Sequence, residues 1–318
     1  MDLRVGAVDC GTNSIRLLIA DVDNGVLRDV DREMRIVRLG QGVDATGEFA
    51  PEAIARTQAA LSEYGELLKT AEVSRIRMVA TSATRDARNR DDFFAMTADI
   101  LGAVVPGAVA EVITGNEEAE LSFRGAVGEL DSAGAPFVVV DLGGGSTEVV
   151  LGDSRGVQAG FSADIGCVRL TERCLHSDPP TAAELAAARE VVRERLAEAL
   201  RVVPVENART WVGVAGTFTT IAALAQNMTR YDPAAIHLSR IGFDELLPVC
   251  AQLIAMTRKQ RAALGPMHEG RVDVIGGGAV VVEELAFALG ARAGIDALTV
   301  SEHDILDGIA LSLADPAQ

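Results

Sequence analysis

At 318 residues the chain is long enough for two domains, each with a core of its own. It carries 46 acidic and 29 basic residues, a net charge of −17, and 48% apolar residues. This balance predicts an ordered globular protein and argues against a coat for DNA or RNA, which needs a broad basic surface. Only Lys69 and Lys259 of the basic residues are lysines. The rest are arginines, which bind phosphate bidentately, so a few well-placed side chains still suit a polyanionic ligand.

The cysteines indicate a reducing compartment. They form no C-x-x-C pair and are too few for a disulfide framework. No signal-peptide pattern precedes the first apolar run, and no stretch of 18 apolar residues would cross a membrane. We therefore expect a cytoplasmic protein with neither a nucleic-acid nor a membrane partner.

The predicted elements repeat one order. The first part reads as three strands, a helix, a strand, a helix, a strand and a helix, as follows: 3–8, 15–22, 26–39, from 51, 76–80, 91–101, 109–113 and from about 115. After a loop at 129–136, three strands, a helix, a strand and a helix follow: 137–140, 148–151, 157–163, 181–200, 210–214 and 218–226. An Asp-x-Gly turn between two strands occurs at Asp9 and again at Asp141, which predicts one domain plan used twice.

Both turns have the ingredients of a phosphate site. Glycines let backbone N–H groups approach an anion, and nearby hydroxyls add donors. The hydroxyls are those of Thr12, Ser14, Ser146 and Thr147. The aspartate that ends each strand would repel phosphate unless a divalent cation lay between them, an arrangement typical of magnesium. A single turn of this kind is explained by a hairpin with glycine in its turn and no ligand. The presence of two such turns, each after a buried strand and an aspartate, favours the phosphate interpretation.

A third candidate is the segment 80–89, which directly follows a strand, where open α/β sheets place their ligand loops. Its Arg85 has the guanidinium that a phosphate needs. The alternative is a surface ion pair between Arg85 and Asp86 or Asp91.

The helix from Gly115 begins with the acidic residues Glu117, Glu118 and Glu120. Acids in a first turn are favoured by the helix dipole, so a purely structural role is the default explanation. The catalytic interpretation requires one of them to act as a base toward water.

A further anion site is possible at Gly216 and Thr217, where a strand ends in a glycine turn at a helix start. The four histidines lie far apart in the sequence, and we assign them no role.

The order of these motifs resembles that of the exopolyphosphatase / guanosine pentaphosphate phosphohydrolase (Ppx/GppA) family. The matching segments are Asp9–Arg16, Ala80–Asn89, Ile113–Ala119, Asp141–Glu148, Val212–Thr217 and Arg271–Ile275. Two departures stand out. The family's Leu-Arg-Glu-Gly element reads Ile305-Leu306-Asp307-Gly308 here, and we expect a short form without the extra C-terminal helical domains of longer members.

The resemblance implies an α/β fold with two actin-like (ribonuclease H-like) domains around an interdomain cleft. Domain I would span residues 1–122, with a C-terminal helix at about 301–318 packing back on it, and domain II residues 123–301. The implied reaction is hydrolysis of the terminal phosphoanhydride of inorganic polyphosphate, in the cytoplasm and by a homodimer.

The resemblance also implies residue roles. Glu118 would be the base for water, with Glu117 in reserve and Glu148 assisting or helping to hold the metal. Asp9, Asp141 and Glu148 would bind Mg²⁺ or Mn²⁺, and Arg85 would act on the reacting phosphate. The remaining phosphate-binding residues would be Asn13, Ser14, Arg16, Gly143, Gly144, Gly145, Ser146, Thr147, Gly216 and Thr217.

Three alternatives stay open. The first is hydrolysis of guanosine pentaphosphate to the tetraphosphate. The second is an ATPase or kinase of the same fold, for which the Gly213-x-x-Gly216-Thr217 turn is a partial match. The third is a non-catalytic sensor of guanosine alarmones, which would not need both Glu118 and Glu148.

Overall fold

Two mixed β-sheets, one in each of two units, form the framework of this computed structural model, which describes residues 3–23 and 25–314. Unit 1 contains the chain up to residue 125 and again from 305, and unit 2 contains 126–304. The expected ends of the two domains at 122 and 301 each lie three residues before residues 125 and 304.

The sheet of unit 1 has the strand order β3-β2-β1-β4-β5. Its strands are β1 (Leu3–Cys10), β2 (Ser14–Asp23), β3 (Val26–Ile36), β4 (Arg75–Ala80) and β5 (Ala110–Val112). The first three form an antiparallel meander, and β4 and β5 continue parallel to β1. The strand predicted to reach residue 39 ends at Ile36, because Arg38 takes a left-handed backbone conformation with φ 51°.

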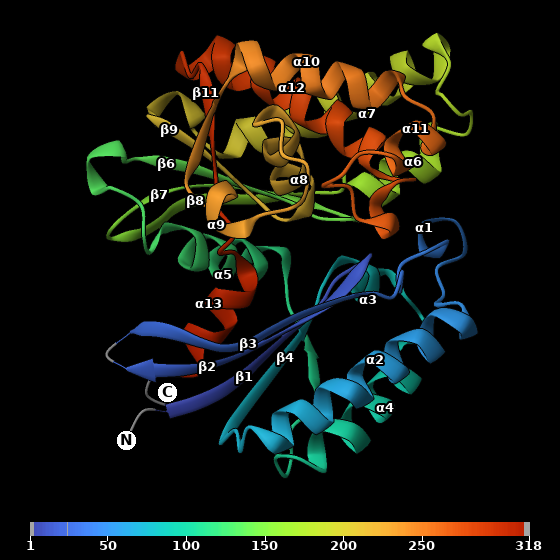
Figure 1. Cartoon of the computed structure of the whole chain (residues 1–318), viewed down its shortest axis with the longest axis vertical. Helices are drawn as coiled ribbons and strands as arrows, with labels where there is room; N and C mark the ends of the chain where they lie inside the picture. Colours follow the sequence, from blue (N-terminus) through green and yellow to red (C-terminus); the bar gives the residue numbers. More distant parts are fainter. Residues whose placement is uncertain (1–2, 24, 315–318) are drawn as a thin grey trace. The chain divides into compact units, whose positions relative to one another are not determined.

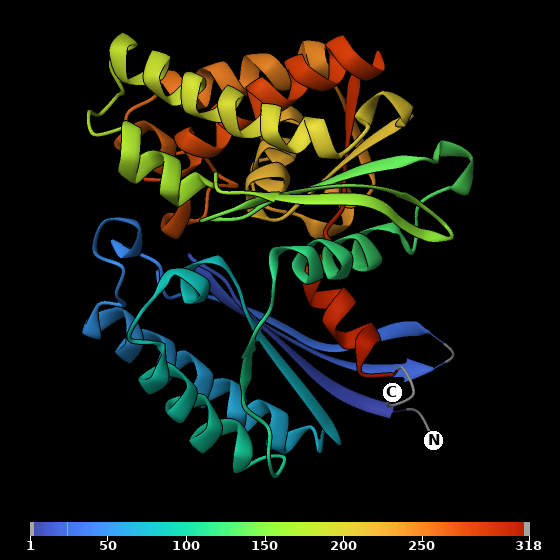
Figure 2. The same cartoon turned by 180° about the vertical axis from the view of Figure 1, so that it is seen from behind.

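Helices cover both faces of this sheet (Figures 1 and 2). The helices of unit 1 are α1 (Val43–Thr46), α2 (Pro51–Thr70), α3 (Ser82–Asp86), α4 (Arg90–Gly102), α5 (Gly115–Val127) and α13 (Ile305–Ser312), of which α2 and α4 lie on one face of the sheet and α13 on the other. Because side chains alternate along a strand, Val8 packs against Leu61 of α2 on one face while Val5 packs toward α5 and α13 on the other. Both faces of β1 are therefore buried from Val5 to Cys10, as its largely apolar sequence predicts.

The C-terminal helix α13 belongs to unit 1 and begins at Ile305, and residues 315–318 of the predicted helix lie outside the described residues. Leu306, at the position of the family's arginine, is buried in the apolar cluster of β1, β2 and α5. The buried carboxylate of the next residue, Asp307, accepts a hydrogen bond from Nη2 of Arg32 at 2.6 Å. Apolar packing and the ion pair between Asp307 and Arg32 thus contribute to holding this helix, and Leu306 is part of the core.

The sheet of unit 2 has the order β10-β11-β9-β6-β7-β8. Its strands are β6 (Phe137–Leu142), β7 (Thr147–Asp153), β8 (Gly156–Ala163), β9 (Thr210–Val214), β10 (Ser239–Gly242) and β11 (Ala297–Val300). Its helices are α6 (Cys167–Cys174), α7 (Ala182–Val202), α8 (Gly216–Ala225), α9 (Pro233–Ile236), α10 (Phe243–Ala255), α11 (Arg258–Ala262) and α12 (Ile275–Ala293), and α7, α10 and α12 pack together in one layer (Figures 1 and 2).

Both units follow one plan, which confirms the α/β fold class and the repeated order of elements. In each, a three-strand antiparallel meander is extended from its first strand by two parallel strands. The antiparallel strand β10 is an addition at the edge of the second sheet. No helix among residues 3–23 and 25–314 has the length and apolar character needed to cross a membrane.

Candidate active site

Three loops of unit 1 leave the carboxyl ends of neighbouring parallel strands. Asp9 on β1 pairs with Val79 on β4, and Ala80 at the end of β4 pairs with Val112 on β5. The loops that follow carry the predicted site residues of the first domain, because open α/β sheets gather ligand loops at this edge. Asp9, Arg85 and Glu118 therefore reach one region from three distant parts of the sequence.

Asp9 and Arg16 form an ion pair across the first hairpin. They face each other in the register of β1 and β2, which places both side chains on the same face of the sheet. Nη2 and Nε of Arg16 donate to Oδ2 of Asp9 at 2.7 and 3.0 Å, and the aspartate is 6% exposed. The charge of Asp9 is thus balanced within unit 1 by a residue predicted to bind phosphate.

Glu118 is buried beside Arg85. Its Oε2 accepts a hydrogen bond from Nη1 of Arg85 at 2.7 Å, and the residue is 7% exposed. Burial raises the pKa of Glu118 to about 7, and the negative charge of Asp9 acts in the same direction, whereas Arg85 opposes both. A carboxylate with this pKa has the proton affinity that a general base needs near neutral pH.

The neighbouring glutamate lies in different surroundings. Glu117 has a half-exposed side chain and accepts a hydrogen bond from Nη2 of Arg77 at 2.5 Å. The first turn of α5 is capped by Thr114, whose hydroxyl accepts from the Glu117 N–H and whose carbonyl accepts from the Glu118 N–H. Since Thr114 already supplies the cap, neither glutamate side chain is needed for that purpose.

The first glycine turn is tied down through its backbone. The carbonyl of Asn13 accepts hydrogen bonds from the N–H groups of Val37 and Arg38, and the N–H of Gly11 donates to the carbonyl of Ser14. These contacts hold the turn against the segment after β3. Asn13 and Ser14, both predicted to bind phosphate, are partly exposed on it.

The second hairpin repeats the register of the first with a different partner. Asp141 on β6 faces Glu148 on β7, and Glu148 faces Ser162 on β8. Ser162 Oγ donates to Oε1 of Glu148 at 2.6 Å. Both carboxylates are buried, and they lie on the same face of the sheet because opposed residues of antiparallel strands do so.

The first turn of helix α6 packs against the glycine turn of this hairpin and donates hydrogen bonds to it. The N–H of Cys167 donates to the carbonyl of Gly143, and the N–H groups of the next two residues donate to that of Gly144. The approach is so close that a Cβ on Gly166 would lie 2.4 Å from the Gly144 carbonyl. The carbonyls of the turn are thereby engaged on the α6 side.

The predicted phosphate ligands of this turn differ in their surroundings. Thr147 is fully buried, and its hydroxyl donates to the carbonyl of Ile165 at 2.6 Å, so this side chain already has a partner inside unit 2. Ser146 is also buried. Gly143 and Gly144 are partly exposed, and Gly145 is buried.

The turn at Gly216 and Thr217 follows β9, which runs parallel to β6 with Val214 opposite Asp141. Ala215 takes a φ of 72°, a conformation that costs energy for a residue with a Cβ and is common at functional turns. The Gly216 carbonyl accepts from Nη1 of Arg271 at 2.9 Å. Arg271, from the last of the quoted motifs, therefore lies against the predicted Gly216 site.

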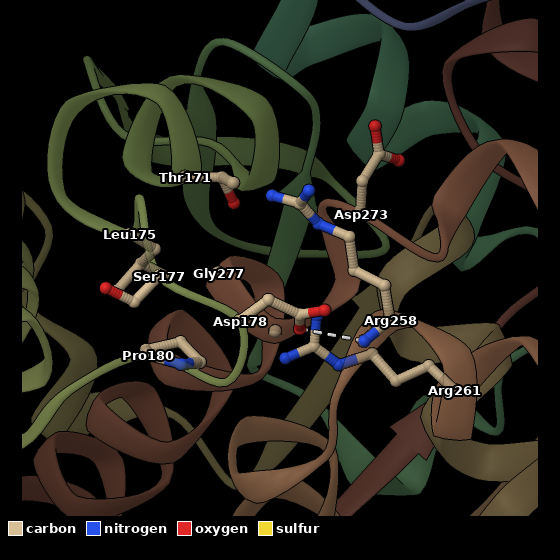
Figure 3. Close-up of a pocket in the computed structure, with 10 residues that line it drawn as sticks. Thr171, Leu175, Ser177, Asp178, Pro180, Arg258, Arg261, Asp273 and Gly277 are labelled. Atoms are coloured by element: carbon tan, nitrogen blue, oxygen red, sulfur yellow. Dashed lines mark hydrogen bonds between the residues drawn. The ribbon is translucent and has the colours of Figure 1, made fainter.

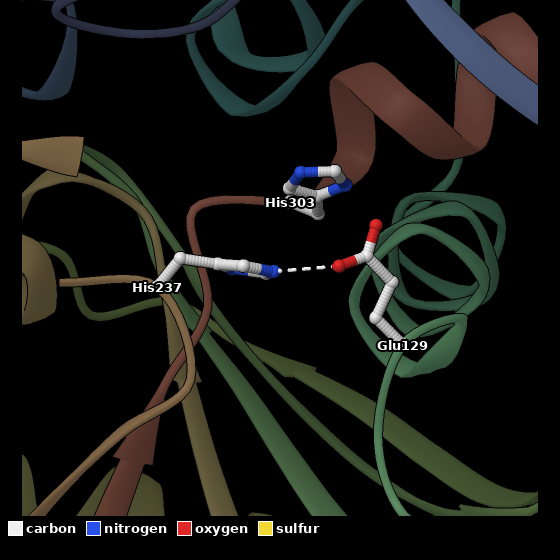
Figure 4. A group of neighbouring side chains, drawn as sticks. All are labelled: Glu129, His237 and His303. Atoms are coloured by element: carbon white, nitrogen blue, oxygen red, sulfur yellow. Dashed lines mark hydrogen bonds and ion pairs between the residues drawn. The ribbon is translucent and has the colours of Figure 1, made fainter. Parts of the chain in front are cut away.

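Two of the histidines come together with an acid, although their positions in the sequence gave no signal (Figure 4). The rings of His237 and His303 stack with centroids 4.6 Å apart, and Nε2 of His237 lies 3.0 Å from Oε2 of Glu129. Nδ1 of His237 accepts the N–H of Glu302, so the proton of the neutral ring is on Nε2 and is donated to Glu129. A metal at Nε2 would need that proton moved to Nδ1, against the Glu302 N–H, so we treat the group as hydrogen-bonded.

The predicted magnesium ligands have the chemistry that a hard cation prefers. Mg²⁺ takes oxygen ligands, with one or two carboxylates and the substrate phosphates. In unit 2, Asp141 and Glu148 offer two carboxylates on one face of the sheet, and in unit 1 Asp9 offers one, whose Oδ2 accepts from Arg16.

Comparisons with known proteins agree over nearly the whole chain. The sequence profile of the Ppx/GppA phosphatase family matches residues 18–313. Exopolyphosphatase 2 of Mycobacterium tuberculosis is 74% identical over 315 residues, 98% of each chain. A crystal structure of an exopolyphosphatase-like protein superposes with a TM-score of 0.94 at 43% identity, covering 98% of this chain and 97% of that one. A guanosine-5′-triphosphate,3′-diphosphate pyrophosphatase of Photobacterium profundum is 33% identical over 224 residues, 70% of this chain and 44% of that protein.

Proposed function

The chain belongs to the Ppx/GppA phosphatase family, and on this premise we propose that it is an exopolyphosphatase. It hydrolyses the terminal phosphoanhydride of inorganic polyphosphate and releases orthophosphate. The observation that carries this proposal is the 74% identity to an exopolyphosphatase over 98% of both chains.

Glu118 is proposed as the general base. The oxygen of a water molecule attacks the terminal phosphorus, the P–O bond to the next phosphate breaks, and its electron pair stays on the shortened chain as a phosphate oxygen. The proton of the water passes to the Glu118 carboxylate. Arg85, which holds Oε2 of Glu118, orients this carboxylate and offers its remaining N–H groups to the terminal phosphate.

The glycine turns and the paired carboxylates are proposed to bind the phosphates and a metal ion. Asp141 and Glu148 would hold Mg²⁺ or Mn²⁺ in unit 2, and Asp9 is the metal ligand proposed in unit 1. The ion supplies neutralisation of the phosphate charge when it is bound. Arg16, Asn13, Ser14 and the Gly143–Thr147 backbone would bind phosphate oxygens, as would Gly216 and Thr217.

Guanosine pentaphosphate hydrolysis is the second candidate, favoured by the similarity to the Photobacterium pyrophosphatase. Both reactions release a terminal phosphate from a phosphoanhydride. The deciding experiment measures phosphate release in parallel from short polyphosphate, long polyphosphate, guanosine pentaphosphate and ATP. Higher kcat/KM on polyphosphate supports the proposal, and a preference for the guanosine substrate or for ATP overturns it.

Two further properties belong to the proposal. The four cysteines are free thiols, which suits the reducing cytoplasm. The chain is proposed to act there as a homodimer, and light scattering at working concentrations would test this: a monomer mass contradicts it.

A further inference from the structure

A buried hydroxyl group contacts the proposed base and has no role among those assigned so far. Thr81 follows directly after β4 and is 4% exposed. Its hydroxyl donates a hydrogen bond to the side chain of Glu118. The predicted catalytic, phosphate-binding and metal-binding residues do not include Thr81, so this contact adds a group to the surroundings of the base.

The hydroxyl of Thr81 is not used as a threonine at this position ordinarily uses it. Thr81 is the N-cap residue of α3, and an N-cap threonine commonly accepts a hydrogen bond from a backbone N–H two or three residues on. Within residues 3–23 and 25–314, its side chain makes no capping hydrogen bond. The short helix therefore lacks a stabilising cap, and the hydroxyl is directed to Glu118 instead.

The backbone of Thr81 fixes the place of this hydroxyl. Its N–H donates to the carbonyl of Cys10 at the end of β1 at 3.3 Å, and its carbonyl accepts the N–H of Arg85 at 3.0 Å. Residues four apart in a helical turn lie on one face, so Thr81 and Arg85 reach the same carboxylate from a single turn. That turn thus presents a hydroxyl and a guanidinium to Glu118.

Two donors have a geometric effect that one donor lacks. The last torsion of a glutamate side chain is broad, so a carboxylate held at one oxygen can still rotate. A second donor from the same rigid turn restricts that rotation. The oxygen that takes the proton of water is then held in one direction, and such orientation lowers the barrier of a reaction.

The hydroxyl also acts on the charge of Glu118. Burial raises the pKa of Glu118 to about 7 and the charge of Asp9 raises it further, whereas Arg85 and then the Thr81 hydroxyl lower it. A hydroxyl carries no charge, so its removal leaves the ionic groups around Glu118 unchanged and takes away only a hydrogen bond.

We propose that Thr81 is a positioning residue for the base, and that its hydroxyl, together with Arg85, holds the Glu118 carboxylate in one orientation toward the attacking water. The inference rests on the proposed function, in which Glu118 takes the proton of that water. Direct binding of a phosphate oxygen by Thr81 is the competing role, and the test separates the two.

The test replaces Thr81 with valine, which keeps the shape of the side chain and has a methyl group in place of the hydroxyl. Thr81→Ser, which keeps the hydroxyl, is the rescue variant, and Thr81→Ala avoids a buried methyl group where the hydroxyl was. Thr84→Val is the matched control, because Thr84 is a fully buried threonine of the same helix whose hydroxyl has no hydrogen-bond partner among the described residues. Urea unfolding checks that each variant is folded.

Phosphate release from inorganic polyphosphate is measured across pH 5.5–9. Thr81→Val and Thr81→Ala should lower the limiting kcat at least about tenfold with KM within about threefold of wild type, because positioning of the base acts in the transition state. The midpoint of the kcat profile should move to higher pH by at least about half a unit, since a bond that favours the ionised carboxylate is lost. Thr81→Ser and Thr84→Val should stay within about threefold of the wild-type kcat and keep its midpoint. A rise in KM at unchanged kcat would show that the hydroxyl binds phosphate and would overturn the proposal.

A second measurement needs no substrate. Carbon-13 NMR follows the carboxyl carbon of Glu118 in protein labelled at its glutamates, and the loss of one signal in Glu118→Gln identifies it. The titration midpoint should lie at higher pH in Thr81→Val than in the wild type and in Thr84→Val. Identical titrations in the three proteins would overturn the proposal and leave the hydrolase assignment in place. A shifted titration in a protein that does not hydrolyse polyphosphate would support the contact between Thr81 and Glu118 and contradict the proposed function alone.

Discussion

Replacing Glu118 with glutamine removes the proposed base while keeping the shape of the side chain and an oxygen for Arg85. A positioned base contributes about 10²–10⁴-fold in rate, so kcat should fall at least about 100-fold with little change in substrate affinity. The pKa of about 7 adds a second signature. The ionised fraction of such a group rises from about a tenth at pH 6 to about nine tenths at pH 8. Wild-type turnover should therefore rise about tenfold over this range, and the residual turnover of the variant should not follow that curve.

The assay is colorimetric phosphate release at saturating and at low substrate across pH 5.5–8.5. Glu117→Gln is the internal control, because Glu117 is half-exposed and paired with Arg77. The kcat of Glu117→Gln should stay within about threefold of the wild-type value, because a surface ion pair contributes little. Normal turnover by Glu118→Gln, or a wild-type profile flat between pH 6 and 8, would refute the assignment of the base.

The same pKa fixes the sign of a stability effect. Burial raises the pKa of Glu118 in the folded state above its ordinary value of 4.5, so the folded state holds this proton more tightly. The contribution of the Glu118 proton to the free energy of unfolding is complete below about pH 4.5 and is lost as the pH rises through about 7. Glutamine does not ionise, so the melting temperature of Glu118→Gln relative to wild type should increase from pH 5 to pH 8. A constant or decreasing difference would contradict the raised pKa.

Three further outcomes are expected. Activity should vanish with a chelator and return with Mg²⁺ or Mn²⁺, since paired carboxylates repel phosphate without a cation; full turnover in chelator would remove Asp141 from the metal role. Arg85→Lys should raise KM more than it lowers kcat, because a point charge does not replace the guanidinium fork, and unchanged kinetics would make Arg85 a structural ion-pair residue only. Gly308→Ala should lower the free energy of unfolding in urea by about 1–3 kcal/mol, because its Cβ would fall 2.0 Å from the Leu121 carbonyl oxygen. Gly128→Ala is the control, since there is open space around Gly128. Equal stabilities of the two variants would show that α13 shifts without cost to make room.

The elements nearest the predicted site were the easiest to predict from sequence, because their signals are local. A buried strand, an aspartate and a glycine turn follow one another in a few residues at Asp9 and at Asp141. The pairing of Asp9 with Arg16 has a local signal too, since the two flank the turn at matching distances. The antiparallel register of β1 and β2 then places Asp9 directly opposite Arg16.

The contact between Arg258 and Asp178 (Figure 3) and the histidine group had no such signal. Arg258 and Asp178 are separated by 80 residues and meet only because α11 packs near the end of α6. Glu129 and His237 likewise come from segments 108 residues apart. The burial that raises the pKa of Glu118 is also a property of the folded state. Sequence pattern supplies the residue type in each case, and tertiary packing supplies the environment that gives it a function.

The repeated hairpin suggests how one plan came to hold two kinds of site. Asp9 and Arg16 occupy the same register positions as Asp141 and Glu148, with both pairs displaced by 132 residues along the chain. Unit 1 places a cation opposite its aspartate and so balances the charge within the protein. Unit 2 places a second acid there, so two carboxylates lie on one face of its sheet. If the register position decides where the metal binds, Glu148→Gln should weaken Mn²⁺ binding in calorimetry at least about tenfold, whereas Asp9→Asn should change it by less than about threefold. The reverse order would place the metal with Asp9 and would show that the Arg16 ion pair opens to admit it.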